Sequence, residues 1–197
     1  MPALTEKNLF SNPHAQMNIL AFWFLIGAEV VVFGCLFGIY VSVQELTTNG
    51  PGAKELFNLS EIIISTIVLL SSSFTCALGV FTLKHEKKRM TLIWFLLTIS
   101  LGIGFVVLEA IEFMAYVGEG ATISSSAFLG AFYMLLGTHG AHVVFGIVWI
   151  SMLLIQLVLH GITKDTAPKL FIASLYWHFI DVVWVFIFTV VYLLGKV

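Results

Sequence analysis

The segment from residue 171 to residue 194 constrains the fold more than any other part of the chain. It has the sequence FIASLYWHFIDVVWVFIFTVVYLL, which as a helix would be about 36 Å long, more than the ~30 Å hydrocarbon core of a bilayer. His178 and Asp181 lie inside this apolar run, three residues apart and therefore on one face of the helix. Because an ionisable group in lipid costs a few kcal/mol or more, we expect this face to contact protein.

Composition extends this conclusion to the whole chain. Of its 197 residues, 59% are hydrophobic and 10% are charged, whereas soluble domains carry about 25% charged residues. The chain is therefore predicted to be an all-α integral membrane protein. Cys35 and Cys76 both lie in apolar segments, where a thiol packs as a small hydrophobic side chain, and we assign them no function.

Long apolar segments separated by short polar links predict five transmembrane helices. We place them at about residues 18–43, 57–83, 91–117, 127–159 and 171–194. Residues 1–17 are expected to form a short polar tail, because they lack the apolar core of a signal peptide. No soluble domain or repeat is predicted between the helices, so residues 18–197 are expected to form a single membrane domain.

The distribution of basic residues predicts an orientation. Lys7, the four basic residues of KHEKKR (residues 84–89), Lys164 and Lys169 make seven of the nine Lys and Arg, and all seven fall on one side of the membrane. Since cytoplasmic loops are enriched in Lys and Arg, we expect the N-terminus in the cytoplasm and the C-terminus outside. Lys54 and Lys196 would then lie outside.

Seven polar groups inside the predicted helices are the candidate site residues. Five of them are expected near the middle of the membrane: Glu29, His139, His142, His178 and Asp181. The other two, the carboxylate pair Glu109 and Glu112, are expected in its outer half. Helices one, four and five are thus expected to pair their polar groups. Hydrogen bonds between helices are the favoured interpretation, with a proton relay or metal site as the alternative and Glu29 as the best proton-linked candidate.

Two other classes of protein remain open at this point. A free-standing redox protein would hold a haem between histidines of helices four and five, for example His178 with His139 or His142. A transporter or proton channel would use Glu29, but the chain has no inverted repeat or broken helix to support it.

Four stretches of the chain carry a family resemblance. They are FWFLIGAEVVVFGCLF (22–37), LEAIEF (108–113), GTHGAHVVFGIVW (137–149) and YWHFIDVVWVFIFTVVYLLG (176–195). In this order they resemble the signature stretches of subunit III of haem-copper terminal oxidases, and the last two are the most specific. The chain is similar to the five-helix bacterial form, which lacks the two N-terminal helices of the seven-helix form.

The resemblance implies a subunit without haem or copper of its own. Such a subunit is docked on the catalytic subunit I and other subunits of a complex in the bacterial cell membrane that reduces oxygen to water and pumps protons. It stabilises subunit I, binds phospholipid, lies near the entrance of a proton pathway and has no nucleic-acid partner. The seven candidate residues match the family's polar positions, with roles that are structural, lipid-contacting or proton-linked: Glu29, Glu109, Glu112, His139, His142, His178 and Asp181. We expect no catalytic residue or metal ligand on this chain.

The electron donor of the complex is less sharply indicated. SSSFTCALG (71–79) and EGATISSSAF (119–128) resemble quinol oxidases, whereas TAPKLFIASLYWHFIDVV (166–183) resembles quinol and cytochrome c oxidases alike. A quinol oxidase is favoured, and a cytochrome c oxidase remains the alternative.

Overall fold

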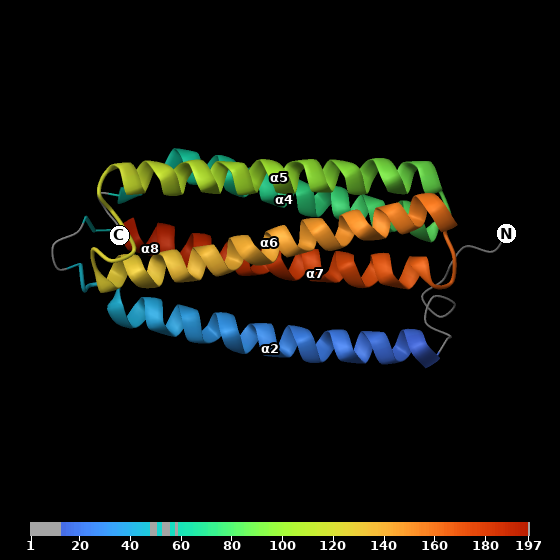
Figure 1. The fold of residues 1–197 in the computed structure, drawn as a ribbon, viewed down its shortest axis with the longest axis horizontal. Coiled ribbons are helices and arrows are strands. Elements are labelled where there is room, and N and C mark those ends of the chain that lie inside the picture. Colours follow the sequence, from blue (N-terminus) through green and yellow to red (C-terminus); the bar gives the residue numbers. More distant parts are fainter. Residues whose placement is uncertain (1–12, 48–50, 53–55, 58, 197) are drawn as a thin grey trace.

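A computed structural model describes residues 13–47, 51–52, 56–57 and 59–196, and its regular elements there are all helices (Figure 1). Five spans among these residues are long and apolar enough to cross a membrane, which confirms the predicted fold class. The elements are α2 (Pro13–Val43), α4 (Leu59–Lys84), α5 (Lys88–Gly118), α6 (Ala127–His160), α7 (Thr166–Ile187), the π-helical η1 (Phe188–Leu193) and α8 (Leu194–Lys196). Residues 1–12, which hold most of the expected tail, lie outside the described residues.

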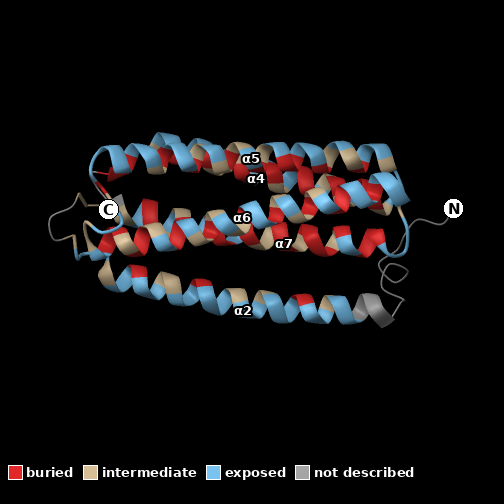
Figure 2. Ribbon diagram, in the orientation of Figure 1, coloured by how far each residue is buried: buried red, intermediate tan, exposed pale blue. Residues whose placement is uncertain are grey.

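Four of the helices form a closed bundle and the remaining helix lies against it. Each of α4, α5, α6 and α7 packs against two of the others, in the ring α4–α5–α6–α7–α4, while α2 packs chiefly on α6 and α7 (Figure 1). Burial follows the same plan, because α7 is buried along most of its length and α2 is exposed on most of its surface (Figure 2). The helix with the predicted ionisable pair is therefore the central one.

The fifth span begins at Thr166, five residues before the expected start. Thr163 and Thr166 exchange backbone-to-hydroxyl hydrogen bonds of 2.8 and 3.1 Å, in the manner of a capping box. Pro168 lies in the first turn, where its missing N–H has no acceptor to lose. Local hydrogen bonding thus extends the helix into the polar link.

The same span changes its winding near its end. Residues Phe188–Leu193 form a π-helical turn, in which Val191 and Tyr192 are buried. A π-turn contains more residues than an α-turn, so it rotates the side chains that follow it relative to an ordinary helix. Here the rotation accompanies the inward placement of Tyr192, whose hydroxyl reaches Glu112 on α5.

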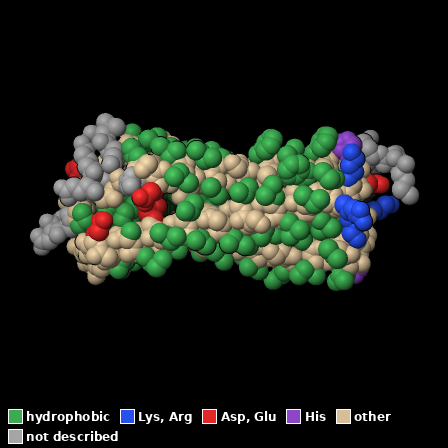
Figure 3. Space-filling view, turned by 90° about the horizontal axis from the view of Figure 1, so that it is seen from above, with side chains coloured by type: hydrophobic (Ala, Val, Ile, Leu, Met, Phe, Trp, Pro, Cys, Tyr) green, Lys and Arg blue, Asp and Glu red, His purple; other side chains and the backbone are tan. Residues whose placement is uncertain are grey.

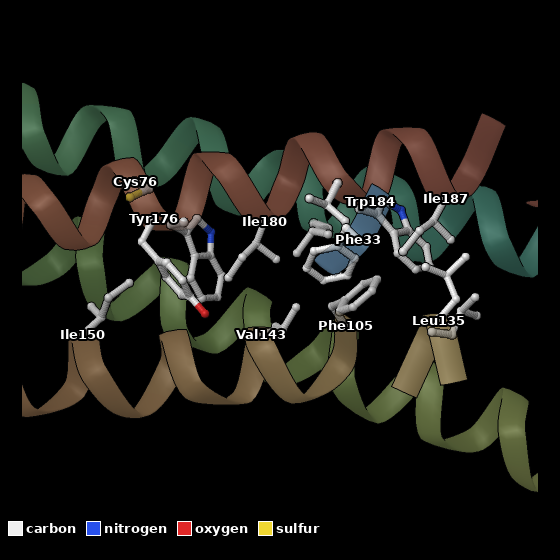
Figure 4. Packing of buried hydrophobic residues seen from close by; sticks show 14 of the residues in the cluster. Phe33, Cys76, Phe105, Leu135, Val143, Ile150, Tyr176, Ile180, Trp184 and Ile187 are labelled. Carbon is white, nitrogen blue, oxygen red and sulfur yellow. The ribbon is translucent and has the colours of Figure 1, made fainter. Parts of the chain in front are cut away.

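Large aromatic side chains from α7 fill the centre of the four-helix bundle. Trp177 and Trp184 are each 1% exposed, and the ring of Trp184 meets that of Phe105 on α5 edge to face at 4.7 Å (Figure 4). Trp177 lies between two glycines, Gly102 on α5 and Gly146 on α6, because a Cβ at either position would fall 2.7 or 3.1 Å from the indole ring. Glycine is required here so that three helices can close on one tryptophan.

Candidate functional site

The clearest polar contact within the membrane joins α2 to α6. Glu29 Oε2 lies 3.0 Å from His142 Nε2, and the other ring nitrogen, Nδ1, donates to the Thr138 carbonyl at 2.7 Å. A carbonyl only accepts, so Nδ1 carries a hydrogen, and one proton then remains to be placed between Nε2 and the carboxylate. Whether that proton lies on Glu29 or on His142, the pair is neutral as a whole, which suits a site inside a bilayer.

A small cavity adjoins this pair. Its volume is about 270 Å³, and both Glu29 and His142 line it together with Leu25, Phe145 and Tyr176. The two paired side chains are each about one-fifth exposed, at 19% and 21%. The predicted pairing of helices one and four is therefore confirmed, and the pair is accessible from outside the bundle.

His178 and Asp181 have a different partner from the one expected. His178 Nδ1 lies 2.7 Å from the hydroxyl of Ser73 on α4. The Asp181 carboxylate is 4% exposed and lies near Ser73 and Cys76 of the same helix, but neither of its buried oxygens has a hydrogen-bond partner among the described residues. The expectation that these side chains pair with helices one and four is wrong. They face the second helix instead, because α7 is packed against α4 on that side.

Two tryptophans extend this contact along the same two helices. The indole N–H of Trp177 donates to Ser72 at 3.0 Å, and that of Trp184 donates to Thr66 at 3.1 Å. Neither hydroxyl was predicted from the sequence, although Ser72 lies in the serine-rich run at residues 71–75. We call the contact of Ser73 with His178 and Asp181 the α4–α7 seam.

His139 is enclosed rather than paired. It is fully buried, and among the described residues neither ring nitrogen has a hydrogen-bond partner. Its ring centroid lies 5.3 Å from that of Trp184, 6.0 Å from that of Phe105 and 6.5 Å from that of Phe33. Packing between aromatic rings is therefore its main observed interaction.

The two outer carboxylates occupy unlike positions. Glu112 accepts hydrogen bonds from the hydroxyls of Tyr116 and Tyr192, the latter at 3.5 Å. Glu109 packs against Gly140 of α6, and its buried Oε1 has no hydrogen-bond partner among the described residues. Tyr116, four residues after Glu112, was visible in the sequence as a same-face neighbour, whereas Tyr192 comes from another helix.

The positions of the histidines bear on the haem and metal interpretations. Both nitrogens of His142 already take part in hydrogen bonds, so a haem iron at this ring would displace Glu29 or the Thr138 carbonyl. In the part of the chain that the structure describes, no three His, Cys, Asp or Glu side chains gather in a way that could hold a metal ion.

Together, the apolar spans and the polar contacts between helices define a multi-pass α-helical membrane protein. The family model described as cytochrome c oxidase subunit III matches residues 13–196. The chain belongs to the cytochrome c oxidase subunit III family. This confirms the family to which the four motifs pointed, and it makes the chain a multi-pass protein of a bacterial membrane.

Individual relatives cover nearly the whole chain. Cytochrome c oxidase subunit 3 of Bacillus sp. (strain PS3) is 45% identical over 196 residues, with 100% of this chain and 94% of the relative covered. Quinol oxidase subunit 3 of Bacillus subtilis (strain 168) is 47% identical over 186 residues, with 94% and 91% covered. Probable quinol oxidase subunit 3 of Staphylococcus saprophyticus is 48% identical over 183 residues, with 92% and 91% covered.

Proposed function

We propose that the chain is the non-catalytic subunit III of a proton-pumping haem-copper terminal oxidase in aerobic respiration. The observation that carries the proposal is family membership over residues 13–196, together with relatives at 45–48% identity named as oxidase subunit 3. In this role the chain stabilises subunit I, while haem and copper lie in partner subunits. The single membrane domain formed by residues 18–197, preceded by the short tail, is the unit that docks.

A quinol is the proposed electron donor of the complex. Relatives named as quinol oxidase subunits reach 47% and 48% identity, slightly above the 45% of the cytochrome c oxidase subunit. The alternative is the same subunit of a cytochrome c oxidase. Oxygen consumption by the purified complex, supplied in turn with a reduced quinol and with reduced cytochrome c, separates the two.

The proposed orientation has the N-terminus in the cytoplasm. Lys and Arg side chains gather at the end of the bundle where α2 begins, while hydrophobic side chains cover the length between the ends (Figures 1 and 3). The described members of this basic end are Lys84, Lys87, Lys88, Arg89, Lys164 and Lys169. An excess of Lys and Arg is typical of cytoplasmic loops. Lys7 and Lys54 lie outside the described residues.

We further propose that the chain binds phospholipid at this basic end. An apolar groove of about 460 Å³ runs between α5 and α6 from Leu92 and Leu159 toward Ile99, and Lys88 donates to the Val158 carbonyl beside it at 3.0 Å. Basic side chains at a membrane surface attract anionic lipid headgroups by about 1 kcal/mol each. Acyl chains in the groove and a headgroup near Lys88 and Arg89 match this arrangement.

The candidate residues divide by role under this proposal. Glu29 and His142 form a proton-sharing link between α2 and α6, and His178 with Asp181 joins α7 to α4. Glu109, Glu112 and His139 lie inside the bundle, where Glu112 accepts hydrogen bonds from two tyrosines and the other two take part in packing. None of the seven is proposed as a catalytic group or as a metal ligand.

Purification of the tagged chain from its native membrane in mild detergent tests the proposal. We expect haem- and copper-containing polypeptides to co-purify, and we expect the haem spectrum to stay with them when this chain is dissociated. A chain that purifies alone and carries its own haem would instead support the free-standing redox protein. A chain that purifies alone without haem would refute both.

A further inference from the structure

Two features of the outer surface of α7 meet between α4 and α2, and together they point to a partner. The first is the α4–α7 seam, in which His178 and Ser73 are only partly buried. The second is an apolar groove of about 290 Å³ between α2 and α7, which includes Gly34, Phe179 and Val182. Phe179 directly follows His178 and Val182 lies one turn beyond it, so the seam and the groove are continuous.

The hydrogen bonding of His178 is incomplete whichever nitrogen carries the hydrogen. Nδ1 is bonded to the Ser73 hydroxyl, and no hydrogen bond to Nε2 is found within the described residues. If Ser73 donates to Nδ1, then Nε2–H is a donor without an acceptor. If Nδ1–H instead donates to the Ser73 oxygen, then Nε2 is an acceptor without a donor. In both cases Nε2 needs a group from another molecule.

Depth limits which molecule can supply that group. His178 is twelve residues after Thr166, so it lies about 18 Å along a span that continues to Leu193, near the middle of the membrane. Lipid headgroups lie at the two ends of such a span, and acyl chains neither donate nor accept hydrogen bonds. An unsatisfied polar group is strongly unfavourable at this depth, so a lipid cover would leave the hydrogen bonding of the seam incomplete.

We propose that the surface made by the seam and the groove, the α4–α7–α2 surface, binds a transmembrane helix of a partner subunit that carries a hydrogen-bonding group opposite His178. Gly34 is exposed and would let the backbone of that helix approach closely, while Val182 and Phe186, which are 53% and 58% exposed, would pack against it. The inference rests on the proposed function, because it presumes a membrane complex, and it states which side of the chain faces that complex.

Substitution of Gly34 tests the surface at a position that is open in the chain itself. A Cβ at Gly34 meets nothing within 4 Å, so the side chain of Gly34→Leu starts into open space and extends over the groove, where it obstructs a docked molecule. Gly137→Leu is the matched control, because Gly137 is equally open but lies on α6. With the tagged chain purified from its native membrane, we expect Gly34→Leu to lower the recovery of haem-containing polypeptides about tenfold or more and Gly137→Leu to change it less than about twofold.

Photo-crosslinking identifies the occupant directly. With a photoreactive amino acid at Val182, we expect adducts with a second transmembrane polypeptide, and at Val148 on α6 we expect none.

Substitution of His178 tests the hydrogen-bonding group. His178→Leu should lower the recovery of haem-containing polypeptides as Gly34→Leu does, whereas His178→Asn, which keeps a donor and an acceptor, should retain more of it.

Several results would overturn the inference while leaving the proposed function intact. These are normal recovery with Gly34→Leu, adducts from Val182 with lipid or with a second copy of this chain alone, and equal adducts from Val182 and Val148. If the unmodified chain recovers no haem-containing polypeptide, the proposed function is the part that fails. An adduct from Val182 with another membrane polypeptide would still support the surface in that case.

Discussion

The pair formed by Glu29 and His142 is the main polar link that holds α2 to the rest of the bundle. We expect Glu29→Leu to leave His142 Nε2 without a partner in an apolar setting and to destabilise the chain by about 1–3 kcal/mol. Glu29→Gln should cost much less, because a side-chain amide still donates to Nε2. Thermal unfolding in detergent measures both. The link would be unimportant if the two variants melted alike and the His142→Leu, Glu29→Leu double variant showed no coupling.

Gly102 is a position at which one added carbon atom, a Cβ, is expected to lower stability. We expect Gly102→Ala to lower stability by about 1–3 kcal/mol, since its Cβ would lie 2.7 Å from the rigid indole of Trp177. Gly104→Ala, two residues along the same helix, is the control, because its nearest contact would be 3.9 Å away at Val68. Unfolding temperature and tryptophan emission report the difference. Equal tolerance of both changes would contradict the close packing of α5 on Trp177.

Helix α7 is held to α4 by hydrogen bonds spaced along both helices. Its two tryptophans donate to hydroxyls of Ser72 and Thr66, and His178, next to Trp177, bonds to Ser73, next to Ser72. Hydrogen bonds between transmembrane helices average well below 2 kcal/mol, so no single one holds the helix in place. Their joint effect is to fix the register and rotation of α7 against α4.

A double-mutant cycle tests this register. We expect Trp184→Phe and Thr66→Val each to cost about 0.5–1.5 kcal/mol from the lost hydrogen bond, in addition to any packing change in Trp184→Phe. The two together should cost less than the sum, because each removes the same bond. Reversible unfolding in mixed micelles gives the four free energies. Strict additivity would mean that the indole of Trp184 is not bonded to Thr66.

The arrangement of helices could be predicted only in part from patterns within each helix. Apolar length predicted five spans, and the start of α6 at residue 127 agrees with the expected position, where Ser126 caps the helix through a 3.1 Å bond to the Leu129 N–H. The π-helical turn at the end of the fifth span was not predicted. Its apolar sequence gives no local signal for extra residues in a turn, and it brings Tyr192 to a carboxylate on another helix.

The proposed orientation of the whole molecule rests on the placement of its Lys and Arg residues, and it makes a further prediction. We expect a reporter enzyme that is active only outside the cell to be active when fused at the C-terminus and inactive when fused at Asp165, in the link between α6 and α7. The same reporter at Glu119, beyond the end of α5, should be active. Activity at Asp165 together with inactivity at the C-terminus would mean that the chain has the opposite orientation.

The sequence by itself determined the class of protein, the number of spans and the family, because these depend on apolar length and on local motifs. It also predicted which polar groups lie near the middle of the membrane, since that position is counted along one helix. The tertiary structure decided which helices those groups face: Glu29 pairs with His142 as expected, whereas His178 and Asp181 face α4. The physical reason is that a membrane helix is apolar on all of its faces, so its sequence does not show which face turns inward. Only the packing of neighbouring helices fixes its rotation.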